Sequence, residues 1–253
     1  MKSKEHTVKS KRLFSKEKLE EMQKQFLDLV LEALERGDIE TAKYWVKRHR
    51  SQQHWFFDSY LHGCTALGTY IYKHMGEEGI FEAMTQAVKF FAEGAATLRK
   101  NVSGGDSGGD EGVKAYVECI ADLWRQHYGE WTIEEDDEKF TFTQDPCGSG
   151  GRLIDMGAYE GPYGYAVIKN AHPITWGEKN IPLYCLHCSI ANEIIPLIIS
   201  GEGSQIWIHD TPCARKPGDK CVHFIYKDPK KIPEKYYKRL GLPRQIKKTM
   251  DIY

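Results

Sequence analysis

The spacing of apolar residues changes near residue 130 of this 253-residue chain. Before that point, apolar residues recur at three- and four-residue intervals, which is typical of amphipathic helices and predicts the first one over residues 15–36. Beyond it, short alternating runs such as residues 140–143 predict strands among many Gly and Pro residues. We therefore expect an α+β fold in which a helical region, residues 15–130, packs against an α+β region, residues 131–253.

Further helices are predicted over residues 39–74, 77–98 and 113–128. Gly63 and Gly68 are candidate positions for a break within the first of these. Residues 101–112 consist largely of Gly, Ser and Asp and predict a flexible loop. The basic segment 1–14 has almost no apolar side chains to bury, so we expect a disordered tail.

The charge balance excludes some classes of partner. The chain has 35 Lys and Arg against 36 Asp and Glu, a net charge of −1, so we expect binding neither to nucleic acid nor to a membrane surface. The longest apolar run, residues 194–199, is far shorter than the roughly 20 residues that span a bilayer. The basic N-terminus is followed by no apolar stretch, which predicts a cytoplasmic protein without a signal peptide.

Four of the seven cysteines lie close together in the sequence: Cys185, Cys188, Cys213 and Cys221. In a protein that is not secreted, such thiols stay reduced and are available for metal binding or chemistry. Two such pairs can surround one tetrahedral zinc ion if a helix and a hairpin lie side by side, with residues 216–219 forming the turn. The alternative is that these cysteines are small buried apolar side chains.

The segment DTPCARKPGDKCVHF, from Asp210 to Phe224, follows Cys188 and resembles the closing signature of the 4-vinyl reductase domain superfamily. That superfamily includes small-molecule-sensing domains of bacterial activators. The same ending is similar to L-2-amino-thiazoline-4-carboxylic acid hydrolases. The resemblance implies a 4-vinyl reductase-like C-terminal half and a zinc ion held by Cys188, Asp210, Cys213 and Cys221, with Cys185 beside them as a competing ligand. Four protein ligands would leave no position for water, so the zinc is expected to be structural.

A glycine-rich loop, residues 144–152, follows the predicted strand. Its glycines let successive backbone N–H groups point into one concavity, and the arginine adds further donors, so the loop is expected to bind a carboxylate or phosphate. The expected substrate-binding residues are Gly148, Ser149, Gly150 and Arg152. Cys147, at the mouth of the loop, is a candidate nucleophile. The alternative is a glycine-rich turn with an incidental thiol.

Two further sets of polar residues are candidates for chemistry. His54, Asp58 and His62 recur every four residues, so on a helix they form one ridge among aromatic side chains. The histidines are expected to act as general acid and base while Asp58 orients one of them; the alternative is a solvated helix face. His172, beyond a run of Tyr and Gly residues, is expected to contact the ligand, unless this segment is a packed surface loop.

These features predict a zinc-containing enzyme that acts on a small organic molecule. The predicted reaction is hydrolysis of a C–N or related bond, as in a hydrolase. The ligand, with an anionic group paired to Arg152, is expected between the histidine ridge and the glycine-rich loop. The rival hypothesis is a non-catalytic, sensor-like binding module with structural zinc. No DNA-recognition region or P-loop follows the domain as an output, which favours the enzyme. A scaffold protein is a third hypothesis, and a homo-oligomer is compatible with any of them.

Overall fold

The computed structural model describes residues 13–103, 109–200, 206–211 and 216–243. The chain divides into two compact units, Met1–Asp58 and Ser59–Tyr253, so this division falls within the predicted helical region rather than near residue 130. Most of the predicted disordered tail lies outside the described residues. Within the parts of the chain that are described, no helix is both long and apolar enough to cross a membrane.

The first unit contains α1 (Lys16–Met22), α2 (Phe26–Glu35) and the beginning of α3 (Ile39–Ser103). The side chain of Ser15 caps α1 by accepting a hydrogen bond from the Lys18 N–H at 3.2 Å. The prediction of one continuous helix over residues 15–36 is wrong, because residues 23–25 interrupt it. These three residues are polar, and α1 before them buries none of its side chains.

The long helix α3 changes direction at Gly76, whose φ of 67° and ψ of −158° are not helical. This break falls between the two predicted helices and confirms their boundary. The predicted break at Gly63 or Gly68 is wrong, since both are helical; at Gly68 the missing side chain lets Leu183 approach, because a Cβ there would lie 2.6 Å from Leu183 Cδ2. The predicted loop over residues 101–112 is also wrong at both ends, which belong to α3 and α4.

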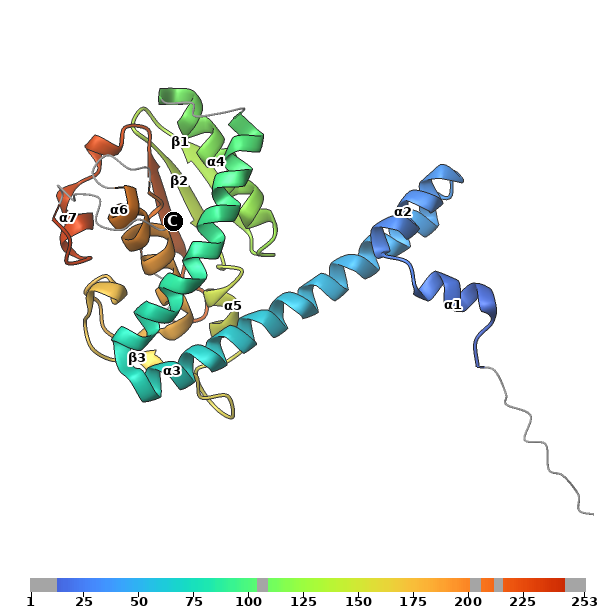
Figure 1. The fold of residues 1–253 in the computed structure, drawn as a ribbon, viewed down its shortest axis with the longest axis horizontal. Helices are drawn as coiled ribbons and strands as arrows, with labels where there is room; N and C mark the ends of the chain where they lie inside the picture. Colours follow the sequence, from blue (N-terminus) through green and yellow to red (C-terminus); the bar gives the residue numbers. More distant parts are fainter. Residues whose placement is uncertain (1–12, 104–108, 201–205, 212–215, 244–253) are drawn as a thin grey trace, which may run out of the picture. The chain divides into compact units, whose positions relative to one another are not determined.

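The second unit is built around a four-stranded antiparallel sheet with the strand order β1-β2-β6-β5. The strands are β1 (Trp131–Glu135), β2 (Lys139–Gln144), β5 (Ile208–Thr211) and β6 (Cys221–Tyr226). Helix α4 (Gly109–Arg125) lies beside the sheet in Figure 1. Its side chains Val117, Ile120 and Trp124 share one face and pack against Phe142 and Ile225 of the sheet.

Short elements complete the second unit. They are α5 (Gly150–Asp155), β3 (Val167–Ile168), η1 (Pro173–Thr175), β4 (Ile181–Pro182), η2 (Leu183–Cys185), the π-helix η3 (Cys188–Ile194), α6 (Ile195–Ser200), η4 (Pro229–Lys231) and α7 (Glu234–Lys238). A large apolar core joins most of these elements, α5 and η4 excepted, to α3 through Ile80 and Val88. The predicted α+β fold, with N-terminal helices followed by a C-terminal sheet and short helices, is confirmed.

Candidate functional site

Cys147 lies in the turn between β2 and α5 and contacts Cys221, the first residue of β6. The pairing of β2 with β6 brings them together, since Gln144 is opposite Cys221. A hydrogen bond from Cys221 holds the pKa of the Cys147 thiol well below its usual value. The backbone N–H of Gly151 and the hydroxyl and N–H of Ser149 act in the same direction, against the effect of burial.

Cys147 also lines a surface pocket of about 280 Å³, as do Gly148 and Arg152 of the same loop. Gly148 is required there, because a Cβ would lie 2.0 Å from the His127 carbonyl oxygen. Glu130 and Asp155 line the pocket as well, so its charge is mixed rather than positive. The expected anion-binding function of this loop therefore stays a prediction.

Ser149 and Gly150, the other two residues expected to bind substrate, are buried and do not line this pocket. Gly150 is pressed against Cys185, since a Cβ there would lie 2.8 Å from the Cys185 sulfur. The Ser149 hydroxyl oxygen lies 3.5 Å from the Cys147 sulfur. The structure therefore places Ser149 and Gly150 where they position the two cysteines.

Tyr184 lies between several of the thiols. Burial raises its pKa well above the usual value, and proximity to Tyr60, Cys188 and Cys147 raises it further. The Cys188 sulfur is 3.4 Å from Nε2 of His187, and burial lowers the pKa of that histidine to about 4. The His187 ring is therefore neutral near pH 7.

The predicted zinc ligands do not meet at one point in the described part of the chain. Asp210 accepts a hydrogen bond from the Tyr236 hydroxyl and lies 3.7 Å from Lys235 Nζ. No group of three or more His, Cys, Asp or Glu side chains among the described residues is arranged to hold a metal ion. Cys213 lies outside those residues. The residues that are described do not fit the implied four-ligand site, and zinc binding stays a prediction that depends on Cys213.

The three residues of the predicted polar ridge all lie on α3, as their spacing requires. His54 and Asp58 belong to the first compact unit, and His62 belongs to the second. His62 Nδ1 is 2.9 Å from the Tyr165 hydroxyl, and its ring contacts that of Tyr163. His62 does not line the Cys147 pocket. The proposed acid and base function of the ridge stays a prediction.

His172 has a structural function in this fold. Its Nδ1 accepts a hydrogen bond from the Ile174 N–H at 3.3 Å, while its own backbone N–H donates to the Thr175 hydroxyl at 2.9 Å. These two bonds cap η1 at its N-terminus. A contact between His172 and a ligand remains untested.

A buried carboxylate that the sequence analysis missed is the centre of a second polar cluster. Glu193, in η3, is fully buried and accepts hydrogen bonds from Trp176 Nε1–H at 2.8 Å and from both the backbone N–H and Nδ1 of His209 at 2.9 Å. Arg239 Nη2 pairs with it at 2.8 Å. Burial alone would raise the pKa of Glu193, but the His209 hydrogen bonds and the Arg239 charge lower it below its usual value.

His209 and His223 are opposite each other on β5 and β6, with ring centroids 4.3 Å apart, and both are almost completely buried. His209 Nδ1 donates to Glu193, which leaves Nε2 as the second ring nitrogen. That atom and both ring nitrogens of His223 have no hydrogen-bond partner among the described residues. The rings of Trp124, Trp176 and Trp207 surround the pair at 5.0 to 5.8 Å.

One sequence signal points to His223. It alternates with the apolar residues of its strand, so Cys221, His223 and Ile225 share the buried face of β6. A histidine in phase with core positions is a candidate for a buried function. Burial lowers the pKa of His223 well below its usual value, as do the nearby His209 and His187.

Comparison of the chain with protein-family models, with curated proteins and with solved structures found no match. The resemblance to the 4-vinyl reductase domain therefore depends on the quoted residues alone.

Proposed function

We propose that this chain is an enzyme that acts on a small organic molecule and hydrolyses a C–N or related bond with Cys147 as the nucleophile. The observation that carries the proposal is the environment of the Cys147 thiol. Its hydrogen bonds favour the thiolate. The residue also lines a pocket whose volume is near the lower end of the range of small-molecule sites. Arg152, on the same wall, is suited to pair with an anionic group of the substrate.

The chemistry follows from these contacts. The Cys147 thiolate attacks the electrophilic carbon, a C–S bond forms, and the C–N bond breaks as the nitrogen leaves with a proton. The Cys221 thiol is a proton donor already in contact with the attacking sulfur. Water then cleaves the C–S bond: its hydroxyl joins the substrate carbon, its proton returns to Cys221, and Cys147 leaves as the thiolate while the second product is released.

Alkylation tests the nucleophile without knowledge of the substrate. At pH 6.5 we expect iodoacetamide to modify Cys147 about tenfold faster than the exposed Cys64, because the thiolate is the reactive species. Mass spectrometry of the peptides from one sample measures both rates. Cys221→Ala removes the main donor to the Cys147 sulfur, so it should move the pH midpoint of Cys147 alkylation upward. A Cys147 that reacts only at alkaline pH, in both proteins, would contradict the proposal.

Metal analysis tests the zinc prediction. If the implied site forms through Cys213, protein produced with zinc present carries about one zinc per chain and loses it in Cys213→Ser. Cys221 would then be a zinc-bound thiolate rather than the hydrogen-bond donor to Cys147. Because binding a structural zinc contributes to folding free energy, the Cys213→Ser variant should also unfold at lower urea concentration. Cys64→Ser is the matched control and should keep its metal. Metal-free protein under these conditions would exclude the site.

The alternative function is a non-catalytic, sensor-like module that binds a small molecule. The buried His223 favours it, since no described residue pairs with its two ring nitrogens and aromatic rings surround it. The two functions differ in the fate of a molecule that co-purifies with the protein. An enzyme converts that molecule and Cys147→Ser stops the conversion, whereas a binding module retains it unchanged in both proteins.

A further inference from the structure

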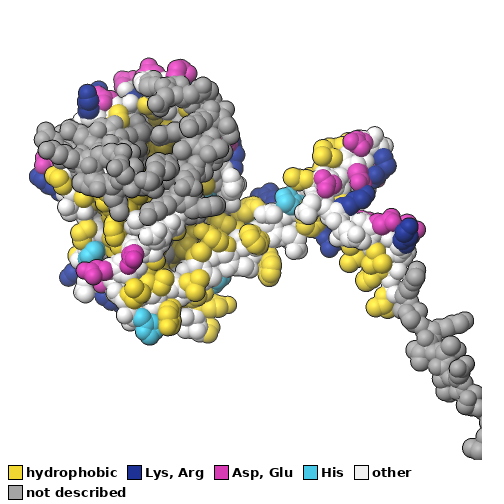
Figure 2. Space-filling view, viewed as in Figure 1, with side chains coloured by type: hydrophobic (Ala, Val, Ile, Leu, Met, Phe, Trp, Pro, Cys, Tyr) yellow, Lys and Arg dark blue, Asp and Glu magenta, His cyan; other side chains and the backbone are white. Residues whose placement is uncertain are grey.

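The N-terminal helical unit exposes far more apolar surface than it buries. In the described residues up to Asp58, the buried apolar side chains are Leu29, Ala33 and Ala42, whereas twelve large apolar side chains are exposed. Figure 2 shows many of them as yellow atoms along α1 and α2. In a unit of this size, the burial of so few apolar side chains provides too little free energy to offset the conformational entropy lost when its helices form. Its exposed face requires a partner surface.

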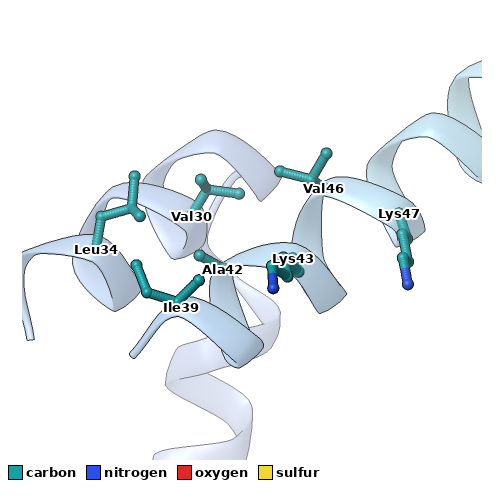
Figure 3. Close-up of a pocket in the computed structure, with 7 residues that line it drawn as sticks. All are labelled: Val30, Leu34, Ile39, Ala42, Lys43, Val46 and Lys47. Atoms are coloured by element: carbon teal, nitrogen blue, oxygen red, sulfur yellow. The ribbon is translucent and has the colours of Figure 1, made fainter. Parts of the chain in front are cut away.

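Part of this surface is a groove between α2 and α3. Its volume is about 300 Å³, and its apolar lining comes from Val30, Leu34, Ile39, Ala42 and Val46, drawn in Figure 3. The groove presents no polar atoms other than those of two lysine side chains at its edge. Its shape and composition suit an apolar ridge from another helix.

The same unit also carries such a ridge. Leu27 and Leu31 lie one turn apart on α2 and are 59% and 57% exposed. They are not among the residues that line the groove. The helical hairpin therefore presents a ridge and a groove on one unit, as self-complementary pairing requires. We call these two features together the hairpin face.

The charges on the hairpin face are complementary as well. Lys43 and Lys47 line the groove, whereas Asp28 and Glu32 directly follow the two ridge leucines. A ridge inserted into a groove of the same kind brings carboxylates toward lysines. Because the face carries both signs of charge rather than a basic cluster, it does not fit an anionic lipid surface.

We propose that the hairpin face pairs with the hairpin face of a second copy of this chain, about a two-fold axis, with each Leu27 and Leu31 ridge in the partner's groove. Five of the exposed apolar side chains belong to the hairpin face: Leu27, Leu31, Leu34, Ile39 and Val46. Each is about half exposed, so the face offers on the order of 400 Å² from each partner, which is typical of a small, weakly associating interface. This pairing is independent of the proposed enzyme function.

Sedimentation velocity of the full chain between 1 and 100 µM tests this pairing. We expect a dimer that Leu31→Asp weakens at least tenfold, because it places an unpaired carboxylate in the partner's apolar groove. Leu67→Asp is the matched control, since Leu67, on α3, is an exposed leucine like Leu31 but lies outside the hairpin face. It should leave the dimer unchanged. Circular dichroism of each variant should retain the wild-type helix content.

A second pair of variants keeps the test independent of folding. Lys47→Glu leaves the apolar contacts in place and should weaken the dimer severalfold by charge repulsion, as expected for exposed ion pairs. Adding Asp28→Lys to it should restore much of the affinity; Asp28 is chosen because Glu32 already pairs with Lys24 of its own chain at 2.6 Å. A wild-type chain that stays monomeric at 100 µM, or an oligomer that Leu31→Asp leaves intact, would overturn the proposal.

Discussion

Replacing Glu193 by Ala is expected to destabilise the folded protein by about 3–5 kcal/mol, the usual result of removing one partner from a buried ion pair. Arg239 would lose its buried counter-charge, and the donors of Trp176 and His209 would lose their acceptor. Urea unfolding at pH 7, followed by tryptophan fluorescence, measures this change.

Glu160→Ala is the control for Glu193, because Glu160 is an exposed glutamate of the same unit and its loss should change stability by less than about 0.5 kcal/mol. The pH dependence provides a second test. Since the pKa of Glu193 is lowered in the folded state, its stabilisation is complete above the ordinary value of 4.5 and is lost as the pH falls through the lower folded value. Equal stability of Glu193→Ala and the wild type would rule out the ion-pair network.

Replacing Trp124 by Ala is expected to cost about 3–5 kcal/mol, as truncation of a large buried aromatic side chain generally does. Trp124 is 2% exposed, and its ring contacts Phe142, Trp207 and His223, so it connects α4 to the sheet. The same urea experiment measures this loss.

Trp55→Ala is the matched control for Trp124, since Trp55 is 67% exposed and its truncation should cost less than about 1 kcal/mol. Similar losses for the two tryptophans would contradict the packing of α4 on the sheet. A third substitution, Trp124→Phe, should recover part of the stability because it keeps an aromatic ring in the contact.

Local patterns were sufficient to predict much of the fold. The three- and four-residue spacing in α4 and the alternation in β2 identified these elements, because each has one face in the core. The boundary at Gly76 was also predicted. The break after α1 was missed because the apolar spacing continues across it, and spacing alone does not reveal where a helix gains no burial.

The candidate site was harder to predict because it depends on contacts between distant segments. The glycine-rich loop was recognised as unusual, but the contact between Cys147 and Cys221 follows from the pairing of β2 with β6, which no local pattern specifies. Glu193 meets His209 only because η3 packs against β5.

The π-helical turn of η3 affects how this part of the sequence can be interpreted. Each residue of a regular α-helix advances by about 100°, so one extra residue in a turn rotates everything after it to a new face. In η3, however, the buried residues Ser189, Ile190, Glu193 and Ile194 keep three- and four-residue spacing. Glu193 therefore lies in phase with the apolar core residues and is turned inward among its donors. A carboxylate that shares the phase of core isoleucines indicates a buried ion pair rather than a solvated helix face.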